Sequence, residues 1–161
     1  MRTRILGCLA VVLLLAGIVV TSSVRAADEP TNGTWKINLA KSKFSPGPAP
    51  TSGSVTIKIE NGSETYSSET VNADGKTVSA SFTAKLDGSD APVTGNPYGD
   101  TISIKHPSPR AFVATIKKDG KVTVTVHVTV AADGKSRTAT YSGKNAEGKV
   151  VHDVIVYEKQ S

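Results

Sequence analysis

The stretch from Val122 to Val130 constrains the fold more than any other part of the chain. Valine occupies every even position, and threonine or histidine occupies the odd positions between them. A strict period of two places all the valines on one face, which is typical of a half-buried β-strand and not of a helix. We therefore predict a strand over residues 121–131 with its even-numbered valines pointing inward.

Short turn sequences connect this strand to two more strands. The four residues beginning at Ala132 and the four beginning at Ala146 each place a Gly after an acidic residue, which favours a tight chain reversal. Further upstream, Asn61-Gly62 is a strong hairpin signal because both residues tolerate positive φ. Residues 121–158 are therefore expected to form a three-stranded antiparallel meander.

The rest of the chain repeats this alternation, and helical periodicity is absent outside the N-terminal segment. Two stretches rich in Pro, Gly and Asp, Ala40–Gly53 and Ser89–Asp100, are expected to be long loops. The predicted strands cover residues 34–38, 54–60, 64–72, 76–86, 101–105, 110–118, 121–131, 135–144 and 149–158.

So many strands must close into a barrel or fold into a sandwich, because one open sheet could not bury its apolar face in a chain of this length. The consecutive hairpins favour an all-β, antiparallel up-and-down barrel of about eight or nine strands.

The N-terminus has the features of a secretory signal. Arg2 and Arg4 precede an apolar run from Ile5 to Val20, and the small residue Ala26 lies a few positions later. This run is short for a membrane span, so we predict cleavage after residue 26. The prediction gives a single β-barrel domain over residues 27–161, without a membrane span, that is secreted or periplasmic in a bacterium.

Cleavage would also change the charge and the cysteine content. Three arginines would leave with the signal, and the net charge would fall from +5 to about +2. This small excess gives little support for nucleic-acid binding. Cys8, the only cysteine, would leave as well, so the mature domain is predicted to lack thiol catalysis and disulfides.

The sequence offers no pattern typical of a catalytic site, a metal site or a cofactor site. The three histidines lack the spacing of zinc ligands, and we expect an exposed His127 and a tucked His152. Glu64 and Glu69 lie at odd spacing on one predicted strand, so they should face opposite sides and not form a glycosidase pair. An enzyme is therefore the least favoured class of function.

Gly33-Thr34-Trp35, at the start of the first predicted strand, resembles the G-x-W pattern of lipocalins and the wider calycin superfamily. In those proteins the Trp packs across the closed end of the barrel, and an Arg from a late strand often covers it. The resemblance implies that Trp35 closes one end of the barrel with Arg137 beside it, and that the 40–53 loop takes the place of the lipocalin lid.

A second resemblance is to small secreted bacterial proteins without an assigned activity. It is carried by residues 33–38, residues 41–44 and the stretch Ala91–Pro97. Neither the lipocalin disulfide nor its C-terminal helix is present. The G-x-G that follows G-T-W in nitrobindin-like haem barrels is also missing, so no haem or other cofactor is expected.

The predicted inward faces consist mostly of Val, Ile and Ala, which are small enough to leave the centre of such a barrel unfilled. We therefore predict an extracytoplasmic, non-enzymatic binding protein for a small apolar or amphipathic molecule. The alternative is a structural or adhesive β-domain of the cell envelope that contacts polymers or partner proteins. The candidate ligand-contacting residues are Ile57, Val78, Ala80, Phe82, Ile104, Phe112, Ala114, Val124 and Val126.

Overall fold

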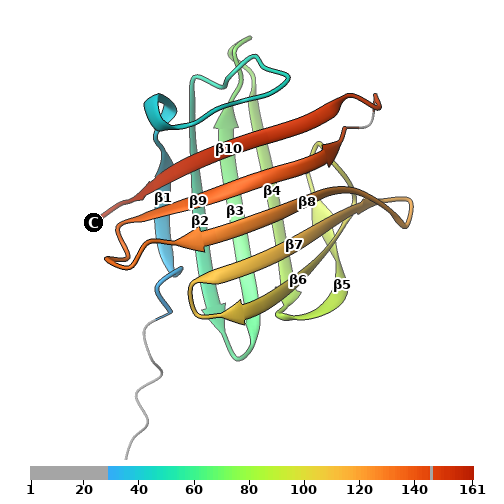
Figure 1. The fold of residues 1–161 in the computed structure, drawn as a ribbon. Helices are drawn as coiled ribbons and strands as arrows, with labels where there is room; N and C mark the ends of the chain where they lie inside the picture. The colour runs from blue at the N-terminus through green and yellow to red at the C-terminus, as the bar shows by residue number, and fades with distance from the viewer. Residues whose placement is uncertain (1–28, 146) are drawn as a thin grey trace, which may run out of the picture.

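A computed structural model describes residues 29–145 and 147–161, which form ten antiparallel strands and one short 3₁₀ helix (Figure 1). The strands are β1 (Gly33–Ile37), β2 (Ser52–Glu60), β3 (Ser63–Val71), β4 (Thr77–Lys85), β5 (Asp87–Thr94), β6 (Thr101–Ser108), β7 (Ala111–Lys118), β8 (Lys121–Val130), β9 (Ser136–Lys144) and β10 (Val150–Lys159). The 3₁₀ helix η1 (Leu39–Lys41) follows β1.

The sheet is a closed barrel with the strand order β1-β10-β9-β8-β7-β6-β5-β4-β3-β2. Consecutive strands pair with each other, and β1 also pairs with β10, which closes the ring. This confirms an all-β, antiparallel up-and-down barrel, an architecture compatible with calycin-like folds, and it rules out the sandwich. The barrel has ten strands, so the expectation of eight or nine was too low.

The C-terminal meander is confirmed in its pairing. β9 lies between β8 and β10, with Ala139 opposite Val128 on one side and Ile155 on the other. The predicted hairpin at Asn61-Gly62 is also present, with φ of 51° and 72° at the two turn residues. Such positive values match a two-residue hairpin turn whose twist suits the strands that it joins.

The additional strand is β5, most of which lies inside the stretch Ser89–Asp100 that was predicted to be a loop. Its composition hides it, because Asp87-Gly88-Ser89-Asp90 reads as a turn and Pro92 lacks an N–H for a sheet hydrogen bond. β5 pairs with β6 through an irregular register, and its register with β4 covers only two residue pairs. Proline and a register shift are tolerated here because the ladders on both sides are incomplete.

Two residues face outward where the sequence indicated otherwise. Val122 is 60% exposed, because a register shift places Val124 opposite Ile116 but Val122 opposite Lys117. The other even-numbered valines of β8 are buried as predicted. His152, expected to be tucked in, is exposed, because the inward face of β10 is the one that starts at Val151.

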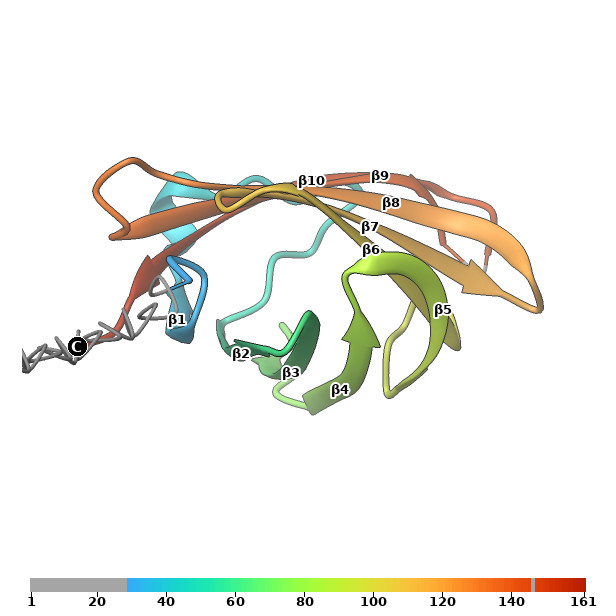
Figure 2. The ribbon, with the colours of Figure 1, turned by 90° about the horizontal axis from the view of Figure 1, so that it is seen from below.

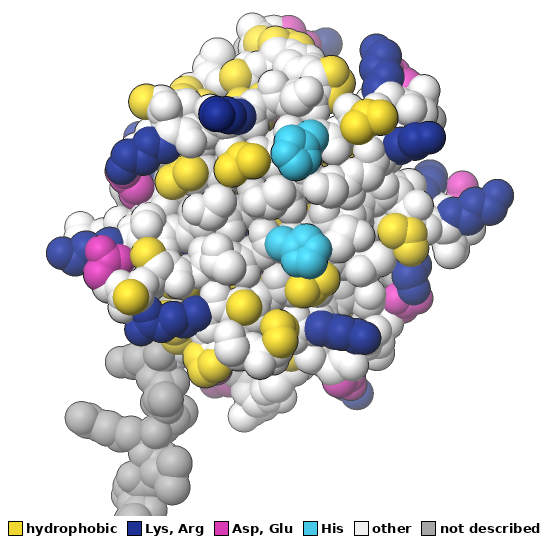
Figure 3. Space-filling view, in the orientation of Figure 1, with side chains coloured by type: hydrophobic (Ala, Val, Ile, Leu, Met, Phe, Trp, Pro, Cys, Tyr) yellow, Lys and Arg dark blue, Asp and Glu magenta, His cyan; other side chains and the backbone are white. Residues whose placement is uncertain are grey.

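The outer face formed by β6 to β10 carries side chains of both charges. Figure 3 shows basic and acidic side chains interspersed around the face that it presents, with histidine side chains standing on it. His127 is exposed, as expected. The predicted signal segment lies outside the described residues, and within the described part of the chain no helix is long and apolar enough to cross a membrane.

Seen from one end, β6 to β10 form one wall of the barrel and β1 to β5 form the other (Figure 2). Because the strands alternate in direction, the loops at residues 38–51, 72–76 and 95–100 gather at one end, which we call the mouth. The Asn61-Gly62 hairpin and the segment that precedes β1 lie at the opposite end, which we call the floor.

Candidate functional site

The interior of the barrel contains a cavity of about 430 Å³. It reaches from the mouth loops, where Phe44, Pro48 and Asn96 line it, down to Glu64 and Tyr157 near the floor. Its volume lies within the range of about 300–1,000 Å³ that is usual for small-molecule sites. The barrel is therefore hollow and not packed solid.

One wall of the cavity is apolar. It is formed by the inward faces of β6, β7 and β8, where β-branched and aromatic side chains alternate with outward polar ones. The side chains of this wall that line the cavity are Ile102, Ile104, Phe112, Ala114, Ile116, Val126 and Val128.

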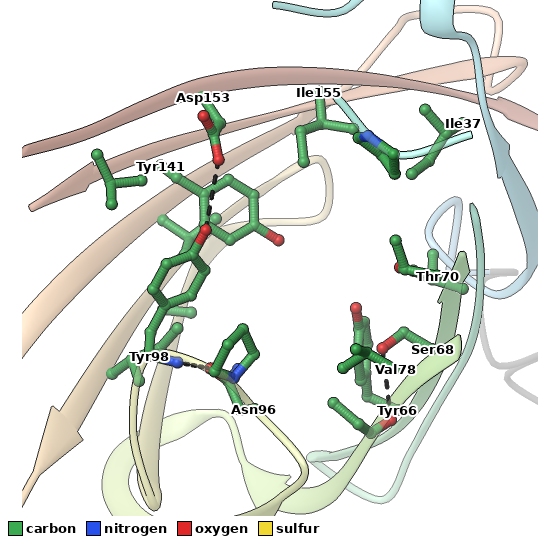
Figure 4. Close-up of a pocket in the computed structure, with 18 of the residues that line it drawn as sticks. Ile37, Tyr66, Ser68, Thr70, Val78, Asn96, Tyr98, Tyr141, Asp153 and Ile155 are labelled. Atoms are coloured by element: carbon green, nitrogen blue, oxygen red, sulfur yellow. Dashed lines mark hydrogen bonds between the residues drawn. The ribbon is translucent and has the colours of Figure 1, made fainter. Parts of the chain in front are cut away.

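The inward face of β3 is polar along its whole length. Glu64, Tyr66, Ser68 and Thr70 alternate with outward residues, and Asn72 follows at the mouth; all five line the cavity. We call these residues the β3 stripe. In the strand order β3 is five places from β8, so the stripe lies opposite the apolar wall. The apolar wall on β6–β8 therefore faces a row of hydrogen-bonding side chains on β3. Figure 4 shows part of the stripe across the cavity from two further polar residues, Tyr141 and Asp153.

At the mouth, the buried carboxylate of Asp153 on β10 joins two loops. Its Oδ1 accepts a hydrogen bond of 2.7 Å from the backbone N–H of Ser45, and its Oδ2 accepts one of 3.4 Å from the Tyr98 hydroxyl (Figure 4). Burial and the nearby Asp153 carboxylate raise the pKa of Tyr98 to about 12, so Tyr98 stays protonated and able to donate. Asp153 thereby fixes the position of both loops over the cavity.

At the floor, Trp35 is completely buried and does not line the cavity. Its Nε1–H donates a 2.8 Å hydrogen bond to the carbonyl of Thr31. The Arg137 guanidinium carbon lies 5.8 Å from the Trp35 ring centroid and 5.4 Å from that of Tyr157, within the range of a cation–π contact. The two residues that the calycin resemblance placed together are therefore in contact beneath the lumen.

Glu64 is the most unusual ionisable group in the lumen. Its side chain is buried, and it forms no ion pair with another described residue. The six ion pairs among the described residues are all exposed or partly exposed, and none includes Glu64 or Arg137. Burial raises the pKa of Glu64 to about 7, and the positive charge of Arg137 only partly opposes this. Near neutral pH the floor therefore holds a carboxyl group that exchanges readily between its two protonation states.

Seven of the nine candidate ligand-contacting residues line the cavity: Val78, Ala80, Phe82, Ile104, Phe112, Ala114 and Val126. Ile57 and Val124 do not; both are fully buried in the hydrophobic core beside it. Both lie on the buried face of their strands, but neither lines the cavity. The role of the seven as ligand contacts stays a prediction.

Neither the β3 stripe nor Asp153 was predicted from the sequence. The signal for the stripe was present, because both faces of residues 64–72 are polar and one face of every strand must line a closed barrel. Asp153 carried no such signal, since it alternates with His152 and Val154 on a strand whose two faces both contain valine.

Metal ligands do not gather in this site. Among residues 29–145 and 147–161, no three His, Cys, Asp or Glu side chains are placed to hold an ion. Comparison with protein-family models and with curated proteins gives no match to this chain. The cavity and its lining are therefore the observations from which a function can be argued.

Proposed function

We propose that the protein is an extracytoplasmic, non-enzymatic carrier or sensor that binds a small apolar or amphipathic molecule in its lumen. The single observation that supports this most is the cavity of about 430 Å³, with an apolar wall on β6–β8 facing the β3 stripe. An amphipathic molecule could bury its apolar part against the wall and direct its polar group toward the stripe. The N-terminal signal pattern supports export.

The chemistry of the lining is suited to binding. The described residues around the cavity include no His, Cys, Lys or Arg side chain. They therefore provide neither a Ser–His nor a Cys–His pair, the usual ways of activating a nucleophile. The tyrosines among them have pKa values raised by burial, which keeps their hydroxyls protonated as hydrogen-bond donors.

Binding of the uncharged fluorescent probe N-phenyl-1-naphthylamine tests the proposal. We expect its fluorescence to rise saturably with protein, at about one probe per chain, because one apolar cavity of suitable size is available. Ala80→Trp and Ala114→Trp should each abolish this binding, since both side chains line the cavity from opposite walls and a bulky ring would fill it. Far-ultraviolet circular dichroism should show that both variants remain folded.

The matched control is Thr83→Trp, which places the same ring on the exposed outer face of β4. It should bind the probe like the original protein. If the original protein does not bind the probe, or if the two inward variants bind it normally, the carrier proposal fails. A structural or adhesive role for the outer surface would then be the better interpretation.

A further inference from the structure

The charged groups that line the lumen are all acidic. Glu64 lies near the floor and Asp153 at the mouth, and no basic side chain lines the cavity among the described residues. The chain as a whole has more basic than acidic residues, so this sign is opposite to its overall charge. The lumen therefore presents negative charge to a ligand although the protein is basic.

Of the two acids, Glu64 is the one without a partner. Asp153 already accepts hydrogen bonds from Ser45 and Tyr98. Glu64 is 7% exposed, and no hydrogen bond or ion pair from a described residue reaches its carboxylate. A buried carboxylate without a donor is costly, so a ligand that donates to it gains an interaction that the empty protein lacks.

Aromatic rings line the lumen. Tyr66, two residues from Glu64 on the same inward face of β3, stacks with Phe82 with their centroids 4.8 Å apart. Tyr98 and Tyr141 lie across the lumen, beside Asp153, with centroids 6.0 Å apart. The face of an aromatic ring attracts a cation that approaches within about 6 Å. Rings and a carboxylate together are suited to a positively charged nitrogen.

We propose that the ligand of the lumen carries a protonated basic nitrogen, with the Glu64 carboxylate as its counter-ion and its apolar part against the β6–β8 wall. This inference rests on the proposed binding function and specifies the chemical class of the ligand. It predicts an apolar amine, and it disfavours fatty acids and other anionic amphiphiles.

Arg137 is the group that could have favoured an anion instead. Its guanidinium is buried between the rings of Trp35 and Tyr157, and it does not line the cavity. Its Nε and Nη1 atoms have no hydrogen-bond partner among the described residues, but they are covered on the floor side of the lumen. An anionic headgroup would therefore meet Glu64 before it could reach Arg137.

Three probes with one tail and different headgroups test the inference: n-decylammonium, n-decanol and n-decanoate, each measured by displacement of N-phenyl-1-naphthylamine at pH 8. We expect the amine to bind about tenfold to a hundredfold more tightly than the alcohol, the usual range for a charged hydrogen bond. Decanoate should bind most weakly. Glu64→Gln should reduce the affinity for the amine to that for the alcohol and leave the dye bound.

The matched control is Glu69→Gln on the same strand, because it removes the same charge from the exposed outer face. It should keep the preference for the amine. Asp153→Asn should also keep most of this preference, which would place the nitrogen at the floor and not at the mouth.

Dependence on pH gives an independent readout. The preference for the amine should shrink as the pH falls below about 7, because Glu64 then takes up a proton. The other charged or titratable groups around Glu64 are Arg137, Tyr66, Tyr141 and Tyr157. Burial raises the pKa of each tyrosine, so none of them changes charge near neutrality.

Each remaining outcome overturns the inference. Tighter binding of decanoate would assign the headgroup to Arg137. Equal binding of all three probes would mean that the lumen recognises only the alkyl chain and not the headgroup. If the dye binds but none of the three probes displaces it, the inference fails while the binding function stands. If the dye itself does not bind, the proposed function fails first.

Discussion

Trp35→Ala is expected to lower the free energy of unfolding by about 3–5 kcal/mol. The Trp35 side chain is fully buried, its Nε1–H donates to the Thr31 carbonyl, and the Arg137 guanidinium lies over its ring. A loss of this size is a large share of the margin of about 5–15 kcal/mol that is typical of a domain. The urea midpoint followed by far-ultraviolet circular dichroism measures the effect without using tryptophan fluorescence.

Two further variants keep this prediction measurable if the alanine variant does not fold. Trp35→Phe retains most of the apolar volume and should lose less stability. Arg137→Ala should also cost less, and combined with Trp35→Phe it should be non-additive by about 0.5–3 kcal/mol because the two side chains touch. An alanine variant with the original midpoint would show that the floor does not depend on Trp35.

Glu64→Gln is expected to stabilise the ligand-free protein by about 3 kcal/mol at pH 8 and hardly at all near pH 4. Burial raises the pKa of Glu64 from 4.5 to about 7, so the folded state holds this proton more tightly than the unfolded state. Below about pH 4.5 the protonated Glu64 carboxyl group makes its full contribution to the stability of the folded state. It is lost as the pH rises through 7, where the folded protein must bury a negative charge.

The measurement is the difference in unfolding free energy between the two proteins at several pH values. Surface carboxylates such as Glu60 and Glu158 have lowered pKa values and titrate with the opposite sign, but they are common to both proteins and cancel. Glu69→Gln is the matched control, since it makes the same substitution on the exposed face of the same strand. A difference independent of pH would mean that Glu64 titrates normally in the folded state.

The sequence supports the barrel more firmly than it supports the site. Strands such as β8 and β10 alternate clearly, and tight turns join them, so their pairing follows from local signals. β5 was missed because its pairing depends on β6 and not on its own composition. Val122 was wrongly predicted to face inward because one extra residue in β8 turns the start of the strand so that Val122 faces outward. The sequence of the strand itself contains no signal for this register shift.

The site depends on which of two similar faces is turned inward. For β3 both faces are polar, and for β10 both contain valine, so neither strand reveals its inner face by hydrophobicity alone. The neighbouring strands determine which face of β3 points inward, because Glu64 is opposite Ile59 on β2 and Ala84 on β4, which are both buried. Position in the closed ring thus sets the chemistry of the lumen, and that position becomes visible only when all ten strands are paired.

The ladder between β1 and β10 also has a consequence for how the chain folds. Every other ladder joins strands that are consecutive in the sequence, so each can form as a local hairpin; this one joins Trp35 to Lys159, at opposite ends of the described chain. Such a distant contact is slow to form because its loop entropy must be lost first. Burial of the only tryptophan should therefore be among the last events of refolding. Stopped-flow fluorescence should lag behind the circular dichroism signal of the sheet.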